Sequence, residues 1–165
     1  MASASTIESI ASQWKVLIDP LVGDQAFSEN VAAGRFHNPA AYHVHNAAQA
    51  VVAYVVEGEG EEAAFTELDD LARIIALRVT TPSASFACFF ELRTLIIQEL
   101  GSAEYHRVAK DVNGRLNACI LHAFDAYVEA REKLSSIANN ELKKRNEMLE
   151  KLAYGSSARE GGALS

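Results

Sequence analysis

The 165-residue sequence is poor in the features that mark secreted, membrane and metal-binding proteins. Its two cysteines, Cys88 and Cys119, lie in apolar stretches without CxxC spacing, so we expect buried free thiols in a reducing compartment and no metal site. No apolar run reaches the ~20 residues of a membrane helix. The N-terminus MASASTIES has neither the basic region nor the apolar core of a signal peptide. These absences predict a cytoplasmic protein without a membrane partner.

The patterns of catalysis and of nucleic-acid binding are also missing. There is no GxSxG motif, no glycine-rich phosphate loop after a strand, and no Glu-x-x-His pair of the di-iron type. The formal net charge is −7, and residues 1–72 hold eleven acidic and two basic residues. No basic patch is interleaved with aromatic residues, which argues against a nucleic-acid partner. We predict no enzymatic activity and no cofactor.

What the sequence has is helical periodicity. With 49% hydrophobic residues, the chain can build an ample core, and its length fits one domain. Apolar residues recur at three- and four-residue steps, and no stretch alternates with the period of a strand. The predicted class is therefore all-α, with about five helices and a further long one. The first is expected from Ser5 to Pro20, and the others comprise a short segment with Phe27 and Val31, then 39–57, 63–79, 82–100 and 104–152.

Capping patterns support several of these boundaries. Asn38 precedes Pro39 and Thr81 precedes Pro82, which combines an N-cap side chain with a proline at the first helical position. Ser5 and Glu8 have the spacing of a capping box. We expect Trp14 to be a core residue, and we expect the helix after Pro82, apolar on most sides, to lie deep in the core.

The long helix is the element around which the chain is organised. Its roughly 49 residues would measure ~70 Å, whereas a compact domain of this size is only ~30 Å across, so one end should project. From Leu116 to Val128 the apolar residues nearly encircle the helix, which predicts burial on most sides. From Arg131 onward the apolar stripe narrows and charged residues dominate.

The narrow stripe has the spacing of a helix that pairs with another helix. Acid-then-base pairs four residues apart add only about 0.3 kcal/mol each, too little to hold a lone helix in water. We predict pairing with a second copy, and the alternative is a helix folded back on its own core. The expected organisation is a globular helical domain over 1–134, an exiting helix over 135–153 and a flexible tail over 154–165. The residues of the pairing stripe are Leu134, Ala138, Leu142, Leu149 and Leu152, with Arg145 interrupting it.

Histidines offer one weak candidate for a cofactor ligand. His122 lies in the core part of the long helix and is a candidate haem ligand, the alternative being a hydrogen-bonded core residue. His43 and His45 are two residues apart, so on a helix they point away from each other and cannot chelate one ion. Glu57, Glu59, Glu61 and Glu62 form a charged run that we expect to be solvated surface.

Two charged residues interrupt apolar faces. Asp125 lies beside Phe124, and Arg93 lies in the helix that follows Pro82. Because a buried carboxylate needs a cation or several hydrogen bonds, we expect a buried ion pair between Asp125 and Arg93, or with Arg73. The alternative is that both side chains reach solvent.

Several blocks of the sequence resemble the N-terminal domain of RsbR/RsbRD-type co-antagonists of the kinase RsbT. The resemblance covers roughly residues 10–150, and its most specific part is an AFD-x-Y-x-x-x-REK stretch that leads into an NE-x-K-R helix. The matching positions are Asn38, Pro39, Arg73, Ile74, Ala76, Pro82, Ser83, Ala123, Phe124, Asp125, Tyr127, Arg131, Glu132, Lys133, Asn140, Glu141, Lys143 and Arg145. Thr81 departs from the family, which often has a serine there.

This resemblance implies a globin-like helical domain without haem that serves as a dimeric sensory module in stress signalling, including stressosomes. In the family the last helix continues into an output domain, whereas no such domain follows Leu152 here. The chain is thus a segment of a longer regulator or a stand-alone sensor. The leading hypothesis is a non-enzymatic homodimeric signalling module that acts on a partner or output domain. The alternative is a globin-type sensor that binds haem or a small ligand.

Overall fold

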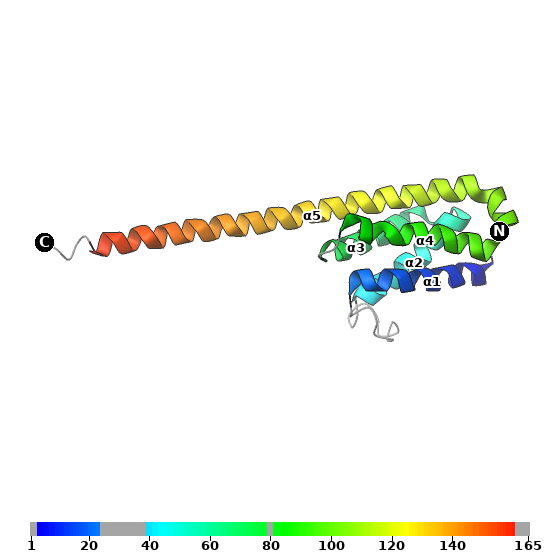
Figure 1. Ribbon diagram of the computed structural model, residues 1–165, viewed down its shortest axis with the longest axis horizontal. Helices are drawn as coiled ribbons and strands as arrows, with labels where there is room; N and C mark the ends of the chain where they lie inside the picture. The colour runs from blue at the N-terminus through cyan, green and yellow to red at the C-terminus, as the bar shows by residue number, and fades with distance from the viewer. Residues whose placement is uncertain (1–2, 24–38, 79–80, 161–165) are drawn as a thin grey trace. The chain divides into compact units, whose positions relative to one another are not determined.

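The computed structural model describes residues 3–23, 39–78 and 81–160, and these residues are all-α (Figure 1). They form five helices and no strand, which confirms the predicted class and the long C-terminal helix. The chain divides into two compact units, residues 1–130 (unit 1) and 131–165 (unit 2). The helices are α1 (Ala4–Val22), α2 (Pro39–Glu57), α3 (Glu61–Ala76), α4 (Pro82–Leu100) and α5 (Ser102–Glu160).

Several predicted boundaries are confirmed. The hydroxyl of Thr81 accepts a hydrogen bond from the backbone N–H of Ala84 and caps α4, with Pro82 at the first helical position. Gly101 ends this helix at φ 75°. α2 begins at Pro39 as expected and is followed by Gly58 at φ 86°. The expected cap Asn38 and the segment with Phe27 and Val31 lie outside the described residues.

The ends of three helices differ from the prediction. Ser3, not Ser5, caps α1 by accepting a hydrogen bond from the N–H of Thr6. Pro20 does not end α1, because a proline in the last turn forfeits few backbone bonds. α3 begins two residues early and ends at Ala76, and α5 continues through Glu160, into the expected tail.

The core of unit 1 is centred on Trp14, which is fully buried as predicted. Its indole Nε1 donates a 2.8 Å hydrogen bond to the carbonyl oxygen of Cys88, and its ring meets Phe89 edge-on at 5.3 Å. This contact joins α1 to α4. The other large, fully buried side chains come from all five helices: Ile10, Ile18, Val22, Val44, Val51, Val52, Val55, Leu68, Leu92, Ile96 and Leu116.

Arginine side chains donate hydrogen bonds to backbone carbonyl groups at the C-terminal ends of two helices. Arg115 on α5 donates from Nε to the oxygen of Val55 (2.9 Å) and from Nη2 to that of Val56 (3.1 Å). Arg78, after α3, donates to the oxygen of Val22 at the end of α1. Because the last carbonyls of a helix have no partner within it, these bonds tie the ends of α1 and α2 to other elements.

None of the described helices combines the length and apolar character needed to span a lipid bilayer.

Candidate functional site: an uncovered apolar face

Large apolar side chains lie uncovered on two helices of unit 1. Phe90 on α4 is 62% exposed, and Leu121 and Phe124 on α5 are 66% and 43% exposed. Phe86 lies one helical turn before Phe90, and Leu121 lies one turn before Phe124, so each pair shares a side of its helix. The rings of Phe86 and Phe124 meet edge-on at 5.5 Å and join the two pairs. We call these four residues the α4–α5 face.

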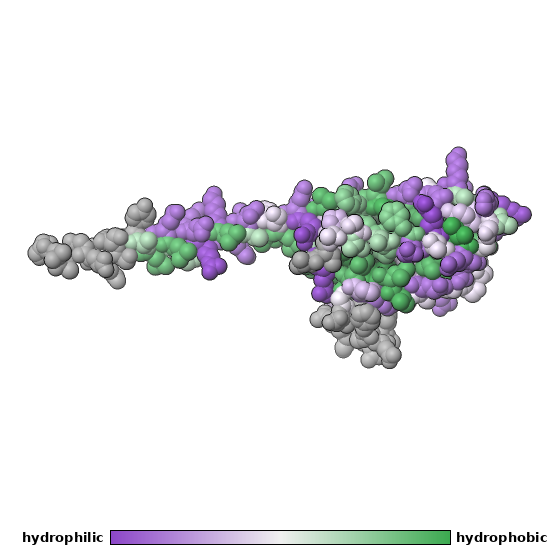
Figure 2. All heavy atoms as spheres, viewed as in Figure 1, coloured by the Kyte–Doolittle hydropathy of each residue, from purple (hydrophilic) through white to green (hydrophobic). Residues whose placement is uncertain are grey.

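The α4–α5 face continues inward into the core. Phe86 lies 5.9 Å from Phe89 with nearly parallel rings, and it meets Tyr127 edge-on at 5.6 Å. Figure 2 shows apolar side chains gathered over α4 and the adjoining part of α5. Contiguous exposed apolar surface of this kind usually marks a place where a protein binds a partner.

This face corrects two predictions. α4 is not deep in the core: only one side of it is buried, through residues such as Leu92 and Ile96. The segment around Leu121 is likewise not buried on most sides. Sequence reasoning assumed that apolar helices find cover within their own chain, whereas a unit of this size covers only one side of each. A helix that is apolar on most sides in so small a domain was the sequence feature that could have indicated an exposed apolar face.

Unit 2, taken by itself, is a helical segment with an apolar stripe. Leu142, Leu149 and Leu152 are 56%, 57% and 68% exposed, and Leu134 is half-buried. The structure adds Ile137 (56% exposed) and Met148 (64% exposed) to this stripe, while Ala138 is also exposed. α5 is helical without a break through Arg131. The pairing of this stripe with a second copy remains a prediction.

The predicted buried ion pair is wrong. Asp125 lies on an exposed side of α5, and among the described residues no ion pair joins it to Arg93. Arg93 is half-buried, and its Nε is buried without a hydrogen-bond partner in that same part of the chain. Arg73 instead pairs with Asp70 at 3.0 Å. Asp19 is a buried acidic residue of unit 1, and its carboxylate accepts a 2.7 Å bond from Lys15.

His122, the candidate haem ligand, is engaged with other side chains. Its Nε2 lies 2.9 Å from Asp69 Oδ1, and its ring stacks on Phe65 at 4.3 Å. The nitrogen that an iron ion would need therefore faces a carboxylate. This geometry matches the alternative reading of His122 as a hydrogen-bonded residue.

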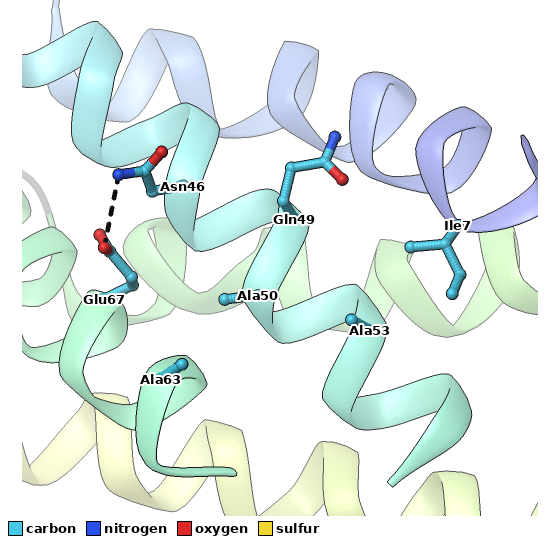
Figure 3. Close-up of a pocket in the computed structure, with 7 residues that line it drawn as sticks. All are labelled: Ile7, Asn46, Gln49, Ala50, Ala53, Ala63 and Glu67. Atoms are coloured by element: carbon cyan, nitrogen blue, oxygen red, sulfur yellow. Dashed lines mark hydrogen bonds between the residues drawn. The ribbon is translucent and has the colours of Figure 1, made fainter. Parts of the chain in front are cut away.

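Beside α1, α2 and α3, unit 1 has an open pocket of about 440 Å³ (Figure 3). Asn46 donates a 3.4 Å hydrogen bond to Glu67 on its wall. Three alanines make up much of the remaining wall. The lining residues are Ile7, Asn46, Gln49, Ala50, Ala53, Ala63 and Glu67.

The other residues singled out in the sequence have structural roles. Cys88 and Cys119 are buried free thiols, and burial raises the pKa of each to about 12. A thiol with so high a pKa is neutral at physiological pH, which disfavours metal binding or redox chemistry. The run of Glu57, Glu59, Glu61 and Glu62 is exposed, as predicted.

Comparison with known proteins identifies the family. The sequence model of the RsbT co-antagonist protein rsbRD N-terminal domain matches residues 21–142, well over half of the chain. No curated protein and no solved structure matches the chain. The matched region contains α2, α3, α4, the α4–α5 face and the start of the apolar stripe. The chain therefore belongs to the family of RsbT co-antagonist rsbRD N-terminal domains, which work in stress signalling.

Proposed function

We propose that this chain is a non-enzymatic sensory module of the RsbT co-antagonist type. In this proposal two copies form a homodimer, and α5 passes a signal to a partner or output domain. The family supports the regulatory setting. The observation that best supports the proposed homodimer is the α4–α5 face, where Phe90 and Leu121 are 62% and 66% exposed.

The α4–α5 face favours burial against a protein surface. Each large apolar side chain gains roughly 1.5–3 kcal/mol when it is moved from water into a packed interface. The face is carried by two helices whose apolar rows are joined by the contact of Phe86 with Phe124. A second copy offers the same rows, and a twofold axis lets one such patch cover another.

The apolar stripe of unit 2 supports the second half of the proposal. Leu142, Leu149 and Leu152 keep heptad-like spacing and stay exposed in the single chain. Charges of both signs surround the stripe, including Glu141 four residues before Arg145. Such pairs support a helix only weakly, so a second helix along the stripe would stabilise it. Paired helices are a rigid connection along which a change in unit 1 is transmitted.

Light scattering on the full chain tests the dimer. We expect twice the chain mass for the natural sequence and for Val16→Glu, a control on α1 whose side chain is 65% exposed. The double variant Phe90→Glu/Leu121→Glu should be monomeric at the same concentration, because each interface would bury four unpaired carboxylates. The double variant Leu142→Glu/Leu149→Glu should weaken the dimer without abolishing it.

Two outcomes would contradict the proposal. A natural chain that stays monomeric at several hundred micromolar rules out the homodimer. A dimer that survives Phe90→Glu/Leu121→Glu but not Leu142→Glu/Leu149→Glu moves the interface from the α4–α5 face to unit 2. Circular dichroism of each variant checks that the helices are intact.

A further inference from the structure

Three side chains of metal-binding type meet between α2 and α3. His43 lies on α2, and Glu67 and Asp70 lie three residues apart on α3, so both carboxylates share one side of that helix. His43 Nδ1 is 3.6 Å from Glu67 Oε2 and 3.6 Å from Asp70 Oδ2. The three atoms lie within 4.8 Å of one another. This cluster is separate from the α4–α5 face.

The atoms at the centre of the cluster lack hydrogen bonds. His43 Nδ1 and Glu67 Oε2 are buried, and neither has a hydrogen-bond partner in the described part of the chain. A separation of 3.6 Å is too long for a hydrogen bond between them. The side chain of His43 is only 12% exposed and that of Glu67 is 24% exposed. Buried polar atoms without hydrogen bonds need another partner, and an ion held between them would supply one.

The outer oxygen of each carboxylate accepts a hydrogen bond from a neighbouring side chain. Asn46 donates to the other oxygen of Glu67, Oε1, at 3.4 Å. Arg73 donates to the other oxygen of Asp70, Oδ1, at 3.0 Å. Outer hydrogen bonds of this kind orient the ligands of metal sites and leave the inner oxygens directed at the ion. The inner oxygens here are the two that face His43.

We propose that His43 Nδ1, Glu67 Oε2 and Asp70 Oδ2 bind one divalent first-row transition metal ion, with Zn²⁺ as the first to test. Imidazole and carboxylate are ligands that these ions accept. Ligands ~2.1 Å from a tetrahedral ion are about 3.4 Å apart, close to both 3.6 Å separations. The two inner oxygens lie within 4.8 Å of each other, so one ion could contact both.

The position of the cluster gives the ion a role beyond cross-linking two helices. Three protein ligands leave a fourth position for water or a small anion. Glu67 and Asn46 also line the open pocket of Figure 3, so the ion would lie beside it. A bound ion would join α2 to α3 and stabilise unit 1 according to its affinity and concentration.

Calorimetric titration of the tag-free full chain with Zn²⁺, after treatment with a chelator, tests this site. We expect one ion per chain with a dissociation constant in the micromolar range or below. His43→Gln and Asp70→Asn should each weaken binding more than tenfold, and Asn46→Ala should weaken it about tenfold. His122→Gln is the matched control: it removes a histidine that contacts a single carboxylate, Asp69, at 2.9 Å, and binding should not change.

Cobalt supplies a readout that does not depend on stability. Co²⁺ at this site should give visible absorption bands that are lost in His43→Gln and kept in His122→Gln. The proposal is overturned if the natural chain binds neither ion below 100 μM, or if His43→Gln binds as tightly as the natural chain. In either case the cluster is a contact of His43 with two carboxylates that holds no ion. The homodimer proposal is unaffected by both results.

Discussion

Arg115 donates a 2.9 Å hydrogen bond from Nε to the carbonyl oxygen of Val55, a residue 60 positions earlier in the chain. The same guanidinium reaches the next carbonyl, so one side chain of α5 caps the end of α2. Arg115→Met keeps much of the side-chain length and removes these bonds. We expect the free energy of unfolding to fall by about 1–2 kcal/mol, since hydrogen bonds to a charged group are stronger than average.

Arg107→Met is the control for that measurement. Arg107 is 79% exposed, and Glu104, at 3.4 Å, is its one ion-pair partner among the described residues, so its loss should change stability by less than about 0.5 kcal/mol. Urea unfolding at one fixed protein concentration measures both variants, because dimer formation would otherwise shift the midpoint. Equal effects of the two substitutions would contradict the capping role of Arg115.

Two glycines in one loop should respond differently to alanine. Gly58 and Gly60 have φ of 86° and 79°, where a Cβ costs ~1–2 kcal/mol. A Cβ at Gly58 would also meet Arg115 Nη1 at 2.9 Å, whereas none of the described atoms lies within 4 Å of a Cβ at Gly60. Gly58→Ala should therefore destabilise the protein more than Gly60→Ala. In an Arg115→Met background, urea unfolding should show this difference disappearing.

Trp14→Phe should destabilise unit 1 by about 2–3 kcal/mol. The change removes the 2.8 Å hydrogen bond to Cys88 and leaves a cavity at a fully buried position. Val16→Ala, on the same helix but 65% exposed, should stay within about 0.5 kcal/mol of the natural protein. Urea unfolding followed by circular dichroism compares the two. A small effect of Trp14→Phe would show that the contact of Trp14 with α4 contributes little to stability.

The two cysteines should be inert in the folded protein. Burial raises the pKa of Cys88 and Cys119 from 9.0 to about 12, so both thiols are neutral at pH 8. A disulfide reagent such as Ellman's should detect neither thiol in the native state and both in guanidinium chloride. Rapid reaction of the native protein would show that one of these thiols is accessible.

The raised pKa values of the two thiols also make the free energy of unfolding depend on pH. Because the folded-state pKa is raised, the contribution of each thiol is complete below the unfolded value of about 9 and is lost as the pH rises toward 12. Stability should fall across this window in the natural chain. It should fall less steeply in the double variant Cys88→Ala/Cys119→Ala.

Most of the fold was predictable because its signals are local. Thr81 with Pro82, and Pro39 with Gly58, mark helix ends through backbone geometry that a few residues decide. The predicted end of α1 at Pro20 was wrong because a proline so close to the end of a helix is tolerated within it. The long helix was visible because its apolar period continues without a breaking residue.

The candidate site was much less predictable. The sequence offers His43 no chelating partner on its own helix, because His45 points away from it, and its actual neighbours Glu67 and Asp70 come from another helix. Asp125 was expected to be buried because its neighbours are apolar, yet it lies on the open side of α5. No spacing within one helix reveals which residues of another helix come within 4 Å.

The sequence alone determined the helical class, the cap at Thr81, the start of α2 at Pro39, the presence of a long C-terminal helix and the family, since each depends on residues close together in the chain. Only the tertiary structure decided which apolar sides are covered, leaving Phe90 and Leu121 exposed while Trp14 is buried. It also decided that His43 meets two carboxylates and that His122 meets one. The reason is physical: helix propensity acts over a few residues, whereas burial and ligand geometry depend on how separate helices pack.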